Sequence, residues 1–148
     1  MTILRTNSDS PDFQLLAAEL ERHLRARDGD LQEYYAQLNR IGSIPQVLVA
    51  YNEDRPIGCG AIREYEEGKA EIKRMYVRPA NRGNGIATRL LEELENWARE
   101  GGCTACVLET GLNQPEAIAF YQKNGYRIIP LFGRYIGSPN SVCFQKEL

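Results

Sequence analysis

The chain has 148 residues, of which 43% are hydrophobic and 26% charged, and its formal net charge at pH 7 is −2. This length fits a single domain over residues 1–148, and the mildly acidic balance argues against a nucleic-acid-binding protein, which usually carries a concentrated basic face. Because the sequence has neither an apolar run of about 18 residues nor an N-terminal signal segment, we expect a cytoplasmic protein with no membrane partner.

The first third of the chain predicts one strand and two helices. Residues 2–5 can form a short edge strand. From Ser10 to Arg27 apolar residues recur at helical spacing, with Ser10 as the N-cap and Pro11 at the first helical position. The Asp-Gly-Asp stretch that follows ends this helix, and residues 31–39 predict a second, shorter helix.

The spacing then changes to that of strands. Strands are expected over residues 47–51, 57–65 and 70–77, and the turn-like stretches NEDR and EEGK make them an antiparallel meander. An amphipathic helix is expected from about Asn84 to Glu100. The remaining elements are a buried strand over 105–110, a helix over 115–123, and strands over 126–129 and 141–146. This order predicts a mixed α/β sheet covered by helices.

The stretch MYVRPANRGNGIATRLL, residues 75–91, places an Arg-Gly cluster between a strand and a helix. The first turn of a helix carries unpaired N–H groups and the positive end of the helix dipole, so it binds anions where small residues let the backbone close around them. Glycines at 83 and 85 suit such a site, and the side chains that can add charge or polar groups are Arg78, Arg82, Asn84 and Thr88. The alternative is a helix start that needs glycine only for a tight turn.

Two other phosphate motifs fit this stretch less well. A Walker loop requires a Lys after the glycines, and none is present. A dinucleotide fingerprint would use Gly83 and Gly85, with Glu109 as the later acidic residue, but Thr88 stands where its third glycine should be. A Rossmann-type nucleotide-binding module is therefore the less favoured alternative.

The run Arg82-Gly83-Asn84-Gly85-Ile86-Ala87 resembles the pyrophosphate loop of the GNAT superfamily of acetyl-CoA-dependent N-acetyltransferases. The later stretch NQPEAIAFYQKNGYR is similar to the second signature of that family, and AEIKRMYV resembles its pantetheine-binding strand. The resemblance implies a mostly antiparallel sheet with a central parallel strand pair and helices on both faces. It also implies acetyl-CoA as co-substrate, and no metal.

By this resemblance, backbone N–H groups of residues 82–88 hold the pyrophosphate, and backbone groups of Met75 and Val77 pair with the pantetheine like an added strand. The implied cofactor-binding residues are Met75, Tyr76, Val77, Arg82, Gly83, Asn84, Gly85, Ile86, Ala87, Thr88 and Asn113. One departure concerns the last of these, because Ala117 stands four residues after Asn113 where the commonest family form has three.

The implied reaction is direct acetyl transfer to a primary amine of a small molecule or peptide. Such an amine has a pKa near that of Lys, about 10.4, so it must lose a proton before it attacks. Glu71 stands at a position that some family members use as the general base, directly or through water; alternatively it is a solvent-facing partner of Lys73 or Arg74. Tyr121 stands at the general-acid position of the family; alternatively it is a core tyrosine.

The acceptor pocket is expected between the first two helices and the late loop, and a homodimer is left open. Candidate acceptor residues, chosen by location, are Asp28, Asp30, Tyr34, Tyr35, Glu109, Phe132, Arg134 and Tyr135. Arg134 is compatible with a carboxylate on the acceptor and equally with a solvated loop residue. A second function, from another class, is a non-catalytic acyl-CoA-binding regulatory module, which would bind CoA without consuming acetyl-CoA.

Two further sequence features, a cysteine pair and a histidine, are interpreted as structural rather than catalytic. Cys103 and Cys106 form a C-x-x-C that follows a helix, whereas a redox pair wants its first sulfur at a helix N-terminus, so the four cysteines are expected to be reduced structural thiols. His23, the one histidine, is expected at the surface of the first helix.

Overall fold

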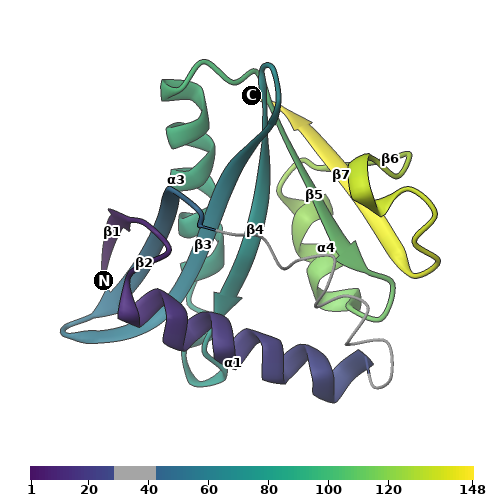
Figure 1. Ribbon diagram of the computed structural model, residues 1–148. Coiled ribbons are helices and arrows are strands. Elements are labelled where there is room, and N and C mark those ends of the chain that lie inside the picture. The colour runs from purple at the N-terminus through teal and green to yellow at the C-terminus, as the bar shows by residue number, and fades with distance from the viewer. Residues whose placement is uncertain (29–42) are drawn as a thin grey trace.

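The computed structural model describes residues 1–28 and 43–148, and Figure 1 shows the arrangement of their elements. The strands are β1 (Thr2–Thr6), β2 (Gln46–Asn52), β3 (Arg55–Glu66), β4 (Lys69–Val77), β5 (Ala105–Gly111), β6 (Arg127–Ile129) and β7 (Ser141–Glu147). The α-helices are α1 (Pro11–Asp28), α3 (Ile86–Glu100) and α4 (Pro115–Lys123), and the short 3-10 helices are η2 (Pro79–Asn81) and η3 (Gly133–Tyr135).

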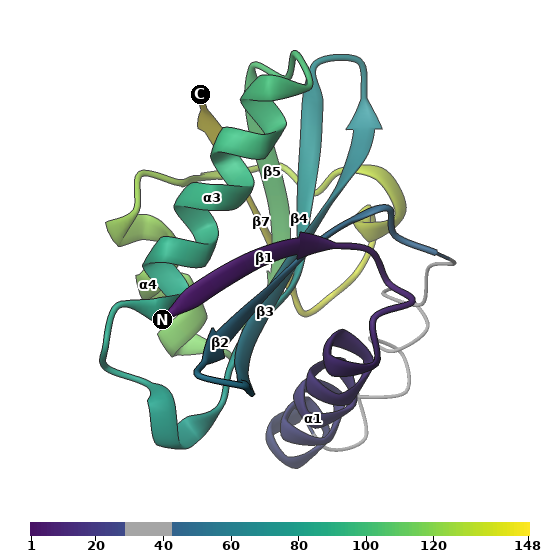
Figure 2. The same ribbon diagram turned by 90° about the vertical axis from the view of Figure 1, so that its left-hand side faces the viewer.

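The seven described strands form one sheet in the order β1-β2-β3-β4-β5-β7-β6. Every neighbouring pair is antiparallel except β4 and β5, which run parallel at the centre of the sheet. Figure 2 shows α1 on one face of the sheet and α3 and α4 on the other. The predicted mixed sheet, with its central parallel pair and helices on both faces, is confirmed.

Two hydrophobic clusters follow from this layering. The larger one joins the sheet to α3 and α4 and includes Leu90, Leu94 and Phe144. The smaller one joins the sheet to α1 and includes Leu16 and Val49. The apolar stripe of α3 was readable from the sequence because its buried residues recur at helical spacing.

Most predicted boundaries lie within two residues of the observed ones. The Oγ of Ser10 accepts a hydrogen bond from the Phe13 N–H (3.2 Å), which confirms Ser10 as the cap of α1. Helix α3 begins at Ile86 rather than Asn84, because Gly85 at its N-cap adopts a left-handed conformation (φ 76°). The helix predicted over residues 31–39 lies outside the described residues.

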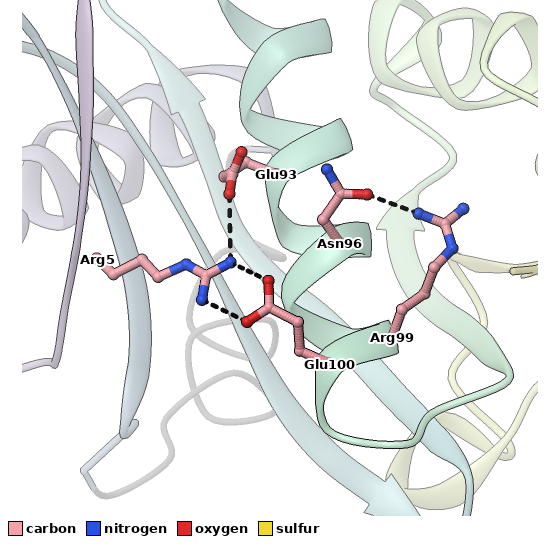
Figure 3. Close-up of polar contacts among 5 residues, drawn as sticks. All are labelled: Arg5, Glu93, Asn96, Arg99 and Glu100. Carbon is pink, nitrogen blue, oxygen red and sulfur yellow. Dashed lines mark hydrogen bonds and ion pairs between the residues drawn. The ribbon is translucent and has the colours of Figure 1, made fainter.

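A polar cluster ties the edge strand β1 to α3 (Figure 3). Arg5 donates two hydrogen bonds of 2.7 Å to Glu100 and one of 3.3 Å to Glu93. These hydrogen bonds raise the pKa of Arg5 above its ordinary value. Beside them, Arg99 donates to the side chain of Asn96 at 2.8 Å. Because these side chains are largely exposed, we infer that the cluster helps to orient β1 against α3 and contributes little to the stability of the fold.

Gly60 of β3 lies where β4 bulges, and we expect Gly60→Ala to lower the free energy of unfolding by about 1–3 kcal/mol. A Cβ there would stand 2.6 Å from the Met75 Sδ and 2.9 Å from the Leu94 Cδ1. Urea unfolding measures the loss. In a Met75→Ala background the sulfur contact is absent, so the same substitution should cost less; an equal cost in both backgrounds would contradict the assigned contact.

In the part of the chain that the structure describes, no helix is long and apolar enough to cross a bilayer. Cys59, Cys103, Cys106 and Cys143 are free thiols. Burial raises the pKa of the Cys59 and Cys106 thiols to about 12. Such thiols stay protonated at neutral pH, which fits packing rather than redox chemistry.

Candidate active site

The central strands separate midway along their length. The β4–β5 ladder holds only from Lys69–Ala105 to Glu71–Val107, and Figure 1 shows the two strands diverging beyond it. A cavity of about 450 Å³ occupies the gap, with residues 72–77 of β4 on one side and residues 109–111 of β5 on the other. The edge of β4 therefore faces the cavity instead of pairing with β5.

A β-bulge turns β4 at this point. Ala61 is opposite Lys73 and Cys59 is opposite Tyr76, so two residues of β4, Arg74 and Met75, face the single Gly60. Arg74 has a φ of 58°, in the left-handed region that residues other than glycine rarely adopt. Bulges bend a strand and increase its twist. This bulge thus contributes to the separation of β4 from β5.

The cavity crosses the sheet from one face to the other. Its walls on the α3 and α4 side are Ala87, Ala117, Phe120 and Tyr121. Its walls on the α1 side are Leu20, His23 and Leu24. Residues from both faces of the sheet therefore line one cavity at its middle.

The predicted anion loop lies at the α3 end of the cavity. Gly83 and Gly85 have φ values of 82° and 76°, and a Cβ added at either would meet nothing within 4 Å. No side chain caps the first turn of α3, so its N–H groups are open to a ligand. Arg82 lines the cavity, and its Nε donates to the Val77 carbonyl at 2.9 Å.

The other predicted cofactor residues fall into three groups. Met75, Tyr76, Val77, Arg82 and Ala87 line the cavity. Gly83, Asn84, Gly85 and Thr88 are exposed or half-buried beside it, and the Asn84 side chain donates back to the loop carbonyls of Asn81 (3.1 Å) and Arg82 (3.4 Å). The Ile86 side chain belongs to the core cluster.

The expectation that Arg78 adds charge to the anion site is wrong. Its guanidinium is held by Glu19 of α1, with an Nη2–Oε2 distance of 2.7 Å and an Nε–Oε1 distance of 3.0 Å. It also donates to the Pro56 carbonyl at 2.9 Å. No local sequence pattern indicates this pair, because its partners are 59 residues apart.

Asn113 is exposed and does not line the cavity, whereas its neighbour Gln114 is buried (7% exposed) and does. Sequence reasoning missed Gln114. The signal was the spacing, because Gln114, not Asn113, stands three residues before Ala117. The cofactor contact of Asn113 stays a prediction.

Tyr121 of α4 lines the cavity. It is 7% exposed, and its ring packs 5.7 Å from that of Tyr126 and 6.2 Å from that of Phe144. Burial raises its pKa above the ordinary tyrosine value. Its hydroxyl donates to no other group among the described residues, so it is available to a ligand in the cavity.

Glu71 pairs with Lys73, as its non-catalytic alternative expected, but it does not face solvent; it is 7% exposed and part of a buried network. Its Oε2 accepts from the Lys73 Nζ at 3.1 Å and from the Tyr135 hydroxyl at 2.7 Å. The Lys73 Nζ also donates to the Tyr135 hydroxyl at 3.1 Å. Burial lowers the pKa of Lys73 and raises that of Tyr135.

Tyr135 separates the cavity from a second hollow. It lines both, whereas Glu71 lines only the second, together with Phe132 and Arg134. Phe132 packs edge-on against Tyr135, with ring centroids 5.4 Å apart. Of the predicted acceptor residues, Tyr135 therefore reaches the cavity, while Phe132 and Arg134 lie behind it.

Glu109 lines the cavity where β4 and β5 part, as its position in the sequence suggested. Its Oε2 accepts a hydrogen bond of 2.6 Å from the Ser141 hydroxyl. Burial raises the pKa of Glu109 to about 6, against the opposing effects of the Ser141 hydrogen bond and the Lys73 charge. A carboxylate with this pKa is ionised at neutral pH and can accept a proton.

Other predictions for the acceptor side have mixed outcomes. His23, expected at the surface, is half-buried and lines the cavity. Asp28 ends α1, and Asp30, Tyr34 and Tyr35 lie outside the described residues. Within residues 1–28 and 43–148, no three His, Cys, Asp or Glu side chains gather as a metal site.

Known proteins resemble this chain in both sequence and architecture. A family model described as "Acetyltransferase (GNAT) family" matches residues 11–126. A protein from Azospirillum brasilense named IAA acetyltransferase is 38% identical over 156 residues, which cover 100% of this chain and 98% of that protein.

Two solved structures extend the comparison. A Klebsiella pneumoniae protein named as an acyl-CoA N-acyltransferase superposes with a TM-score of 0.83 at 34% identity, covering 99% of this chain and 97% of that one. A GNAT family acetyltransferase from Elizabethkingia anophelis, solved with acetyl-CoA bound, has a TM-score of 0.67 at 20% identity, covering 99% and 97% of the two chains. It shares the fold.

Proposed function

The chain belongs to the GNAT family of acetyltransferases, and from this premise we propose that it transfers acetyl from acetyl-CoA directly to a primary amine of a small molecule or peptide. The observation that carries the proposal is the cavity that crosses the sheet between β4 and β5. One end of it adjoins an uncapped, glycine-rich helix start, and the other end opens toward α1.

Acetyl-CoA would enter from the side of α3 and α4. The open N–H groups of the first turn of α3 and the loop before it bind the pyrophosphate, and Arg82 adds positive charge beside them. The pantetheine lies along the cavity-facing edge of β4, where the backbone of Met75 and Val77 can pair with its amides like an added strand. This arrangement brings the thioester to the gap beside Tyr121.

The chemistry requires a base, an oxyanion site and an acid. The family resemblance suggests Glu71 as the base, directly or through water, and the amine attacks the thioester carbonyl after losing a proton. A backbone N–H of β4 near Met75 stabilises the developing oxyanion. Tyr121, whose hydroxyl is available in the cavity wall, donates a proton to the departing thiolate.

Thermal unfolding in the presence of acetyl-CoA, CoA or NAD tests the ligand assignment. A ligand at 100 times its Kd stabilises the folded protein by about 2.7 kcal/mol, which for a domain of this size raises the midpoint by roughly 5–10 °C. We expect that rise with acetyl-CoA and CoA and none with NAD. A response to NAD alone would overturn the proposal in favour of a nucleotide-binding module.

Release of CoA thiol in the presence of primary amines then tests turnover. We expect acetyl-CoA to be consumed only when an amine is added. Binding of acetyl-CoA without consumption by any amine would instead indicate a non-catalytic acyl-CoA-binding module.

A further inference from the structure

Three ionisable side chains near the gap share one face of the sheet. Ile72 of β4 and Leu108 of β5 belong to the core cluster with α3 and α4. Because successive side chains of a strand point to opposite faces, the flanking residues Glu71, Lys73 and Glu109 point to the face that α1 covers. An acceptor on the α1 side therefore faces this set, of which Lys73 and Glu109 line the cavity.

One carboxylate oxygen of Glu71, Oε2, is held by two neighbours. Its carboxylate accepts hydrogen bonds from both Lys73 and Tyr135, and the side chain of Lys73 is only 2% exposed. Tyr135 lines both the cavity and the hollow that Glu71 lines, whereas Glu71 does not line the cavity. To contact an amine in the cavity, Glu71 would have to leave both partners and expose a buried Lys charge without its counterion, which is costly.

Glu109 has the opposite surroundings. It lines the cavity itself, and a neutral donor, the Ser141 hydroxyl, fixes its orientation. The charges of Lys73 and Arg134 act on Glu109, but within the described residues neither side chain forms an ion pair with it, and Lys73 is paired with Glu71 instead. A buried carboxylate without a cationic partner is unfavourable, and an acceptor that arrives as an ammonium ion would supply one.

We propose that Glu109 binds the acceptor's ammonium group and takes its proton, and that Glu71 acts through Lys73 and Tyr135 as a positioning residue. This assignment rests on the proposed function and replaces the sequence-based choice of Glu71 as base. Glu109 and Tyr121 then act from opposite faces of the sheet, one on the amine and the other on the leaving sulfur.

The proton balance of this step is simple. The ammonium gives one proton to Glu109, the free amine forms a C–N bond with the carbonyl carbon, and the C–S bond breaks. The thiolate takes the Tyr121 proton, and the second proton lost by the nitrogen restores Tyr121. Glu109 returns its proton to water, so each turnover releases one proton.

The pH dependence follows from the groups that face Glu109. Lys73 and Glu71 on β4, Arg134 and Tyr135 at η3 and Cys143 on β7 are charged or titratable groups around it, and His23 of α1 lines the same cavity. Activity needs the ionised form, so kcat/KM for the amine should rise with pH through about 6. The Ser141 hydrogen bond lowers this pKa and the Glu71 charge raises it.

The test is the pH profile of thiol release between pH 5 and 9, with glycine, L-lysine, putrescine and phenylethylamine as acceptors. In Glu109→Gln we expect kcat/KM to fall about 10²-fold or more. The rise of kcat/KM with pH near 6, called the limb below, should also disappear. In Ser141→Ala the limb should move to higher pH, and in Glu71→Gln to lower pH. Glu92→Gln, at an exposed position of α3, is the control and should match the wild type.

Each outcome decides the assignment. A limb that persists in Glu109→Gln and vanishes in Glu71→Gln identifies Glu71 as the base and overturns the proposal. A limb that persists in Glu109→Gln and vanishes in His23→Asn assigns it to His23, with the same consequence. Loss of the acetyl-CoA-induced thermal shift in Glu109→Gln would mean a disturbed site and would also count against the proposal.

The two levels of proposal can fail separately. If the wild type consumes no acetyl-CoA with any of the four amines, the proposed function fails and the role of Glu109 fails with it. If the wild type turns over and Glu109→Gln keeps both its rate and its limb, only the role of Glu109 is overturned.

Discussion

Replacing Tyr121 with phenylalanine is expected to lower kcat for acetyl transfer by about 10²-fold or more, with little change in acetyl-CoA affinity. The substitution keeps the ring that packs against Tyr126 and Phe144 and removes only the hydroxyl. Since that hydroxyl donates to no described residue, its loss leaves no buried partner unsatisfied. The expected loss is therefore in catalysis and not in stability.

Steady-state thiol release gives kcat, and the thermal shift with acetyl-CoA gives binding. Burial raises the pKa of Tyr121, so the hydroxyl stays protonated to higher pH than an ordinary tyrosine. The acid should therefore remain functional across the neutral range, and Tyr121 itself should cause no fall in rate between pH 6 and about 9.

Tyr126→Phe is the matched control, because Tyr126 packs against Tyr121 but donates its hydroxyl to the buried Glu95 at 2.8 Å. There we expect the reverse pattern, with an unchanged kcat and a stability loss of about 1–3 kcal/mol from the lost hydrogen bond to Glu95, which keeps its ion pair with Lys146. An equal loss of kcat in the two variants would show that ring packing, and not proton donation, explains the effect at position 121.

The fold was largely predictable because its signals are local. The apolar stripe of α3, the Ser10 cap and the short turns of the meander each depend on residues a few positions apart. The central parallel pair was expected only from the family resemblance, since no local pattern specifies which distant strands pair. The late start of α3 reflects the conformation of Gly85, which a hydrophobic pattern does not report.

The site was predictable only in part, for the same reason. The anion loop and Tyr121 belong to contiguous motifs, and the structure places both at one cavity. The Glu71–Tyr135 and Glu109–Ser141 hydrogen bonds join residues 64 and 32 positions apart. Those contacts decide which carboxylate faces a ligand, so the choice between Glu71 and Glu109 needs the three-dimensional arrangement.

Adding a methyl group to the loop before α3, as Gly83→Ala or Gly85→Ala, is expected to weaken acetyl-CoA binding by about 10- to 100-fold. The left-handed φ at both positions disfavours alanine by about 1–2 kcal/mol, so the backbone should shift away from the geometry that aims its N–H groups at the pyrophosphate. Hydrogen bonds to a charged group contribute about 1.5–3 kcal/mol each, and loss of one accounts for the expected change.

Calorimetric titration of acetyl-CoA into each variant measures this effect, and the chain provides a matched control at the other end of the same helix. Gly102 has a φ of 89°, and its added Cβ would also meet nothing within 4 Å. Gly102→Ala should therefore carry a similar backbone strain and a similar fall in melting temperature while leaving the Kd for acetyl-CoA unchanged. If Gly102→Ala weakens binding as much as Gly85→Ala, the loss comes from general destabilisation of α3, and the pyrophosphate does not lie on this loop.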